Sequence, residues 1–140
     1  FNNLLFFFLG LNLVLFAGNL ETLFIGWEIL GVTSFFLIAF YRDRYLPVKN
    51  ALKVVSLYRL GDIALLLGVW LCHHYFGESI NFARLADLQA HHITIIKQTS
   101  FQIIIPGIFL IVALIKSAQL PFSSWLPRAM EGPTTSTAVF

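Results

Sequence analysis

The sequence predicts an all-α membrane protein, part of a polytopic helical bundle with about four transmembrane spans, the last one a discontinuous helix. Hydrophobic residues make up 58% of the 140 residues, and the mean hydropathy is +0.81. Charged residues make up 11%, whereas soluble domains carry about a quarter. The apolar residues fall into long runs that polar segments separate. We therefore expect residues 1–140 to form a single transmembrane region, an internal portion of a longer subunit.

The first span is expected over residues 4–18 and the second over residues 23–41. Asn19 and Thr22 lie between them, and either side chain could cap the second helix. The second span has the length of roughly 20 residues that a bilayer core requires. Its one acidic residue is Glu28, and intramembrane carboxylates usually face a bundle interior and serve ion pathways. The alternatives for Glu28 are a position near the membrane interface or a simple helix–helix hydrogen bond.

A basic loop is expected next, over residues 41–53. The positive-inside rule places such a loop on the cytoplasmic side of the membrane. The net charge of the whole chain is only +2, which is too small to indicate a nucleic-acid partner. The apolar composition makes the lipid bilayer the expected partner. Four basic residues stand in this loop against the single acid Asp43: Arg42, Arg44, Lys49 and Lys53.

The third span is expected over residues 54–75 and contains Arg59 and Asp62. Residues three apart on a helix share a face and can form an ion pair. Such a pair lowers the cost of both charges in lipid, so a purely structural role is a serious alternative to a functional one.

Two histidine pairs flank the polar stretch after the third span, His73-His74 and His91-His92. Adjacent helical residues point apart, and no cysteine or carboxylate pattern completes a known ligand spacing. We therefore expect no metal site. The single cysteine, Cys72, permits no internal disulfide.

The fourth span, residues 101–130, is expected to be broken. An uncharged run over residues 103–115 ends at Lys116, and Pro121 and Pro127 follow. Proline breaks or kinks a helix, and in a bilayer the freed carbonyl groups need protein or trapped water. A buried ammonium group gives up its proton readily, because desolvation disfavours the charged form. Lys116 is therefore a candidate proton relay; the alternative is a lysine that extends to the interface from a helix end.

Four intramembrane charges on three successive spans indicate ion or proton conduction: Glu28, Arg59, Asp62 and Lys116. The alternative is a scaffold subunit whose charges only hold helices together. The sequence has no Gly-rich phosphate loop, no nucleophile elbow and no haem or iron–sulfur ligand pattern. We expect no cofactor in this chain, and any coupled redox reaction would occur on a partner.

Three segments carry a family resemblance: GWEILGVTSFFLI (26–38), YRLGDIALLLG (58–68) and KSAQLPFSSWLPRAMEGPT (116–134). They resemble the proton-conducting antiporter family, which includes the large antiporter-like subunits of NADH:quinone oxidoreductase (respiratory complex I) and of multisubunit Na+/H+ antiporters. The resemblance is closest to the largest such subunit of complex I, the chain 5 or L type.

The resemblance implies a role for each charge. Glu28 matches a glutamate on helix five that tunes a lysine on helix seven, which Lys116 matches. Asp62 matches an aspartate on helix six, with Arg59 as its neighbour. The four spans would then be helices four to seven of about fourteen, within one half of an inverted repeat.

The function implied is proton translocation coupled to electron transfer on partner subunits, in a bacterial inner membrane or an equivalent energy-coupling membrane. The expected partners are other membrane subunits of a multi-subunit complex. The segment Pro133-Thr134-Thr135 differs from the usual Pro-Thr-Pro of complex I members. The alternatives are therefore a cation/H+ antiporter subunit, or a subunit for proton-coupled uptake of inorganic carbon that works with a soluble zinc protein.

Overall fold

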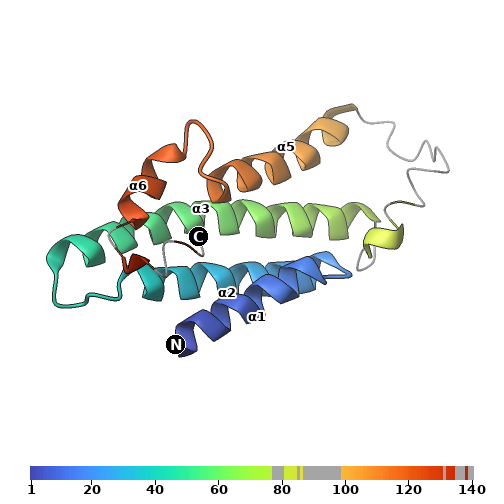
Figure 1. Cartoon of the computed structure of the whole chain (residues 1–140). Coiled ribbons are helices and arrows are strands. Elements are labelled where there is room, and N and C mark those ends of the chain that lie inside the picture. The colour runs from blue at the N-terminus through green and yellow to red at the C-terminus, as the bar shows by residue number, and fades with distance from the viewer. Residues whose placement is uncertain (77–80, 85, 87–98, 131, 135–137, 139–140) are drawn as a thin grey trace.

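The computed structural model describes most of the chain, and the secondary-structure elements of the described part are helices, as predicted (Figure 1). The described residues are 1–76, 81–84, 86, 99–130, 132–134 and 138. His91 and His92 lie outside them. The helices are α1 (Asn2–Leu15), α2 (Leu20–Ile38), α3 (Tyr45–Phe76) and α5 (Thr99–Lys116), followed by the short 3-10 helix η1 (Ser123–Trp125) and by α6 (Leu126–Ala129).

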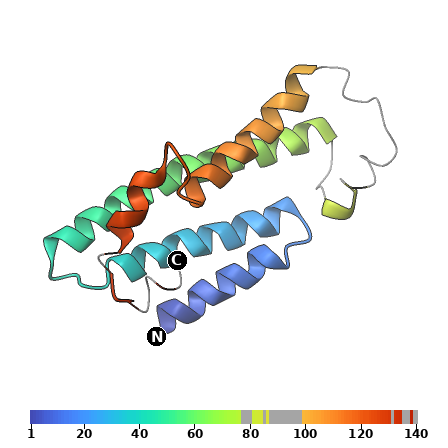
Figure 2. The same ribbon diagram turned by 45° about the horizontal axis from the view of Figure 1, so that its top comes forward.

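Helix α3 is the central element of the bundle. Helix α2 contacts α3 on one side and α5 contacts it on another, while α1 packs on α2. Figures 1 and 2 show the same order, with α6 lying over the first turns of α3. Two helical segments, Leu20–Ile38 and Tyr45–His74, are long and apolar enough to cross a membrane. Two further apolar helices, Asn2–Leu15 and Ile103–Lys116, are shorter.

The start of α2 is set by Asn19, one of the two predicted caps. Its backbone is extended, and its side-chain oxygen accepts a hydrogen bond of 2.8 Å from the backbone N–H of Thr22. This contact satisfies one of the free N–H groups that every helix start leaves unpaired.

The predicted basic loop over residues 41–53 is wrong in its second half. Helix α3 begins at Tyr45, so Lys49 and Lys53 lie on its first turns. Pro47 does not prevent this, because proline in a first helical turn lacks only an N–H that would be unpaired there anyway. The connection between α2 and α3 is thus limited to residues 39–44.

Glycines bring α1 and α2 into close contact. A Cβ atom on Gly26 would lie 2.9 Å from the backbone nitrogen of Val14, and one on Gly10 would lie 2.9 Å from Cγ2 of Ile29. No side chain fits at these distances, so the two backbones approach as small residues allow in membrane helix pairs.

The predicted discontinuity of the fourth span is confirmed, and its position is set by Ala118. Helix α5 ends at Lys116, and Ala118 has a left-handed backbone with φ of 53°. The N–H of Gln119 bonds the carbonyl of Leu114 at 3.0 Å, and the N–H of Ala118 bonds that of Ile115 at 3.4 Å. These two bonds form a Schellman motif, which satisfies the last carbonyl groups of a helix.

Both prolines of the predicted discontinuity follow this break. Pro121 comes three residues after Ala118, and Pro127 lies in the first turn of α6. The Nε1–H of Trp125 donates a 2.9 Å hydrogen bond back to the carbonyl of Ile115. The segment after the break is therefore fastened to the end of α5.

Candidate functional site

Four charged residues from three helices gather beside the break in the fourth span. Glu28 comes from α2, Arg59 and Asp62 from α3, and Lys116 is the last residue of α5. These are the four residues that the sequence singled out. The structure brings them together, and their role in a proton path stays a prediction.

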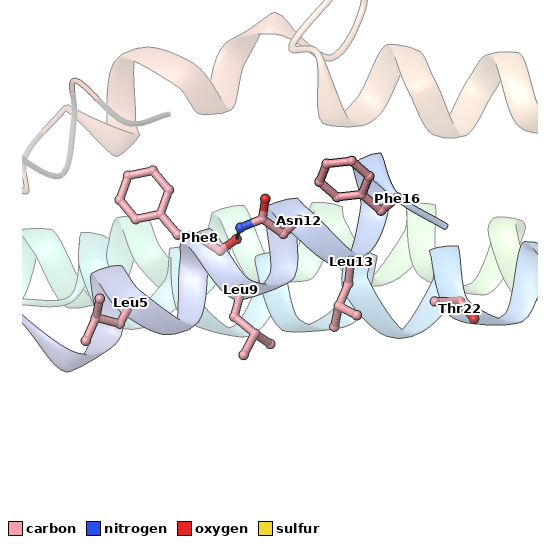
Figure 3. A pocket seen from close by; sticks show the side chains of 7 residues that line it. All are labelled: Leu5, Phe8, Leu9, Asn12, Leu13, Phe16 and Thr22. Carbon is pink, nitrogen blue, oxygen red and sulfur yellow. Dashed lines mark hydrogen bonds between the residues drawn. The ribbon is translucent and has the colours of Figure 1, made fainter. Parts of the chain in front are cut away.

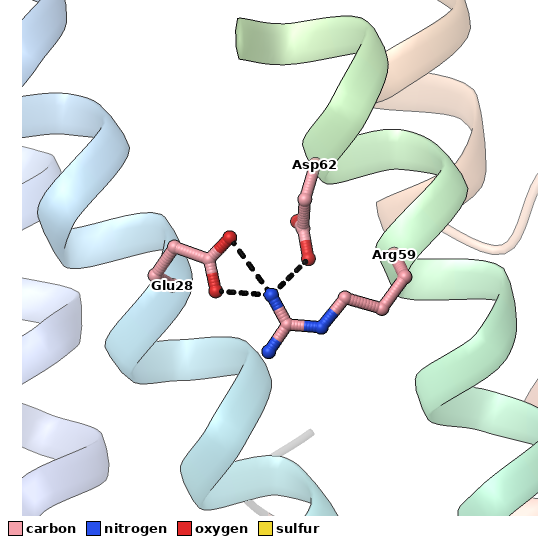
Figure 4. A network of polar contacts seen from close by, with 3 residues as sticks. All are labelled: Glu28, Arg59 and Asp62. Carbon is pink, nitrogen blue, oxygen red and sulfur yellow. Dashed lines mark hydrogen bonds and ion pairs between the residues drawn. The ribbon is translucent and has the colours of Figure 1, made fainter.

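Arg59 holds the two carboxylates with one nitrogen atom. Its Nη1 lies 2.9 and 3.1 Å from the two oxygens of Glu28 and 3.7 Å from Oδ2 of Asp62 (Figure 4). The pairing of Arg59 with Asp62 was predicted from their spacing. The shorter contact with Glu28 was not, because no sequence pattern relates residues on different helices. Exposure of the side chains falls from 53% for Arg59 to 26% for Glu28 and 8% for Asp62.

Asp62 and Lys116 each keep one buried polar atom without a hydrogen-bond partner among the described residues. These atoms are Oδ1 of Asp62 and Nζ of Lys116. A buried polar atom without a partner is costly and calls for an explanation such as an ordered water or a chemical role. Here one atom is an acceptor and the other a donor.

A cavity of about 150 Å³ lies between α2 and α3 at this cluster. A water molecule takes up about 30 Å³ in the liquid, so the space suits a small group of waters. Its polar wall contains Glu28, Arg59 and Asp62. The remaining lining residues are apolar or aromatic apart from the Tyr58 hydroxyl: Gly31, Val32, Phe35, Phe36, Leu52, Val55 and Tyr58.

Lys116 lies next to this cavity, where its Nζ atom lies beside the lining residues Gly31 and Tyr58. A Cβ atom on Gly31 would lie 3.6 Å from Nζ of Lys116 and 4.0 Å from Cδ2 of Tyr58. The Nζ atom also lies 4.2 Å from the ring centroid of Tyr58 and 5.0 Å from that of Trp27. Sequence reasoning missed Trp27 and Tyr58, although each directly precedes a charged residue that it did identify.

A larger groove runs along α1 and contains no comparable chemistry. Its volume is about 560 Å³, and the amide nitrogen of Asn12 in it donates to the carbonyl of Phe8 at 2.9 Å (Figure 3). That polar group is satisfied within its own helix. The lining residues are Leu5, Phe8, Leu9, Asn12, Leu13, Phe16 and Thr22. We therefore place the functional site at the charge cluster and not at this larger groove.

An apolar helical bundle with a balanced cluster of charges beside a broken helix defines a class of protein, the polytopic membrane proteins with an internal polar path. Comparison with known families makes this specific. The family described as NADH:quinone oxidoreductase/Mrp antiporter, transmembrane region, matches residues 17–140. The chain belongs to this family and is an integral membrane protein.

Individual relatives agree with the family match. The chain is 40% identical over 141 residues to NADH-ubiquinone oxidoreductase chain 5 of Petromyzon marinus, an alignment that covers 99% of this chain and 22% of the relative. It is 35% identical over 133 residues to NADH-quinone oxidoreductase subunit L of Buchnera aphidicola. This alignment covers 95% of this chain and 21% of the relative. NADH-quinone oxidoreductase subunit L of Neisseria meningitidis is 34% identical over 145 residues. This alignment covers 99% of this chain and 22% of the relative. The chain thus spans about a fifth of the length of these relatives.

Proposed function

We propose that this chain is part of a proton-conducting membrane subunit of an NADH:quinone oxidoreductase, and that protons pass through the α2–α3 cavity and Lys116. The family and the names of the relatives support the activity. One structural observation supports the site. Two buried atoms of opposite charge, Oδ1 of Asp62 and Nζ of Lys116, lack hydrogen-bond partners among the described residues beside a cavity of water-holding size.

In this proposal, Lys116 holds a proton and the two carboxylates control its release. The charges of Asp62 and Glu28 act on the lysine, so a change in either alters its proton affinity. Arg59 neutralises Glu28 in the present arrangement. Arg59 is the most exposed of the three ion-paired side chains, so it is the group that would withdraw and free Glu28 to act on the lysine through water in the cavity.

The driving reaction takes place elsewhere in this proposal. Electron transfer on partner subunits would move the charges of the cluster, and other membrane subunits would contact this one. The membrane would be an energy-coupling membrane, such as a bacterial inner membrane or its equivalent.

The test uses membrane vesicles that contain the full-length protein in its complex. A pH-sensitive dye reports the proton gradient after NADH is added. We expect Lys116→Ala to reduce the initial rate by at least about tenfold, in keeping with the loss of a positioned proton carrier, and Glu28→Gln to reduce it less. Lys53→Ala is the matched control, because Lys53 is an exposed lysine on α3 away from the cluster.

Three outcomes separate the alternatives. Loss of the gradient in Lys116→Ala with normal assembly supports the proposal. Wild-type transport in Lys116→Ala and Glu28→Gln contradicts it and favours a scaffold role. Transport that does not depend on NADH, together with poor growth of both variants at low CO2, contradicts it in favour of inorganic-carbon uptake with a soluble zinc protein.

A further inference from the structure

We propose that Trp27 and Tyr58 form an aromatic cage that positions the Lys116 ammonium group, an inference that rests on the proposed function. The two rings come from different helices, α2 and α3, and the ammonium comes from α5. Its Nζ atom lies 5.0 Å from the centroid of Trp27 and 4.2 Å from that of Tyr58. Both distances are within the roughly 6 Å over which a ring face attracts a cation.

The cage matters because no direct polar contact with another described residue fixes the position of the ammonium. Nζ is buried and has no hydrogen-bond partner among the described residues, and Lys116 has no ion pair within this part of the chain. The negative faces of aromatic rings attract cations most strongly where water is excluded. The rings therefore hold the ammonium beside the carboxylates without a direct ion pair, which would trap the charge.

The cage is also attached to the segment after the helix break. Tyr58 meets Trp125 edge to face, with 5.1 Å between the ring centroids and 79° between the planes. Trp125 in turn donates its Nε1–H to the carbonyl of Ile115, the residue before Lys116. The Tyr58 ring thus contacts both Lys116 and Trp125 of η1. The segment after the helix break therefore helps to fix the position of the ring.

Gly31 leaves the space that the cage needs. It follows Trp27 by one helical turn, and a Cβ atom there would be 3.6 Å from Nζ of Lys116. That is ordinary van der Waals contact. A larger side chain at position 31 would enter the volume between Trp27 and Tyr58 and displace the ammonium.

The test changes the electron density of one ring while its shape stays nearly constant. In the full-length protein within its complex, position 58 is replaced by Leu, by Phe and by phenylalanines that carry one, two or three ring fluorines. Fluorine withdraws electron density from the ring face and weakens its attraction for a cation. The readout is the initial rate of NADH-driven proton transport in vesicles, with assembly measured in parallel.

We expect Tyr58→Phe to transport within about twofold of the wild type, because the ring face remains. The fluorinated series should then fall stepwise, by roughly three- to tenfold in total, with Tyr58→Leu at or below its end. The matched control is the same series at Phe8, an aromatic residue that lines the groove along α1 and lies outside the α2–α3 cavity. That series should be flat.

The failure of the cage can be told from the failure of the proposed function. A flat series at position 58, with transport lost in Lys116→Ala, overturns the cage and leaves the proton path in place. Wild-type transport in Lys116→Ala overturns the proposed function and the cage together. If Tyr58→Leu does not assemble, the fluorinated variants still decide, because they keep the shape of the ring.

Discussion

The two faces of helix α2 are built on opposite principles. Toward α1, Gly26 lies against the backbone of Val14, where a Cβ atom would come within 2.9 Å. Toward α3 and α5, Gly31 leaves room for a methyl group, because a Cβ atom there would meet its nearest neighbour at 3.6 Å, an ordinary van der Waals contact. Residues 1–20, which include all of α1, contain no acidic or basic side chain, whereas α3 and α5 contribute Arg59, Asp62 and Lys116 to the cluster.

Under the proposed function, this difference lets one helix serve both stability and transport. Close backbone packing excludes water and gives van der Waals contact, which is what holds helices together in lipid. Charges in a membrane need partners, and the charged interface keeps a cavity of water-holding size beside them. The same residue type, glycine, produces contact on one face and space on the other.

The largest effect on assembly should come from removing Asp62 at the charged interface of α2 with α3 and α5. Asp62→Ala removes the buried carboxylate of the cluster and leaves Glu28 as the one carboxylate beside Arg59 and Lys116. An uncompensated charge inside a membrane costs about 3 kcal/mol. We expect a large fall in the amount of assembled complex and in its temperature of thermal inactivation. Asp43→Ala, which removes an exposed acid, should change neither, and equal loss in both variants would contradict the account.

The second-largest effect should come from Gly26→Leu, at the tightly packed interface between α1 and α2. The new side chain has no room against the backbone of Val14, and overpacking costs about 1–3 kcal/mol. The helices α1 and α2 should separate, which lowers assembly measured in the same way. Gly107→Leu is the matched control, because a Cβ atom on Gly107 meets nothing within 4 Å. Normal assembly of Gly26→Leu would show that the two backbones are not in close contact.

The helix break should become more stable in Ala118→Gly. An alanine in the left-handed region costs about 1 kcal/mol, and glycine avoids that cost at the end of a Schellman motif, although glycine also loses more backbone entropy on folding. We expect a net gain of about 0.5 kcal/mol, seen as a small rise in the temperature of thermal inactivation. A fall in that temperature would argue against the left-handed conformation of Ala118.

The smallest effect should come from Gly31→Ala, which sharpens the contrast with Gly26. A methyl group fits at 3.6 Å from Nζ of Lys116, so assembly should be normal. Proton transport should stay within about twofold of the wild type, because ordinary van der Waals contact costs little. A loss comparable to that of Gly26→Leu would mean that this face is as tightly packed as the other.

The helices, the four charges and the Asn19 cap could be predicted from the sequence, because each has a local signal. Long apolar runs indicate the helices, and the charges inside these runs are the ones that gather at the site. The end of the basic loop was placed wrongly because the loop was drawn around its basic residues, whereas Lys49 and Lys53 lie on the first turns of α3. The break beside Lys116 was predicted, but the left-handed backbone of Ala118 that produces it was not, since an alanine in that conformation has no sequence signal.

The contacts of the site were beyond local reasoning. The bond between Arg59 and Glu28 joins residues 31 positions apart, and the cage of Trp27 and Tyr58 depends on how three helices lie against one another. Sequence spacing fixes which residues share a face of one helix. It does not fix which faces meet, because that is decided by packing between helices.

The most direct test of this contrast is the access of water to the two faces of α2 in the full-length protein. Val32→Cys places a thiol in the α2–α3 cavity, and Val14→Cys places one against Gly26. A small, charged, water-soluble thiosulfonate reacts only with thiols that water reaches. We expect modification of Val32→Cys at least about tenfold faster, because a thiol must ionise in water to react. Equal rates at the two positions would contradict a wet, proton-conducting face opposite a dry, packed one.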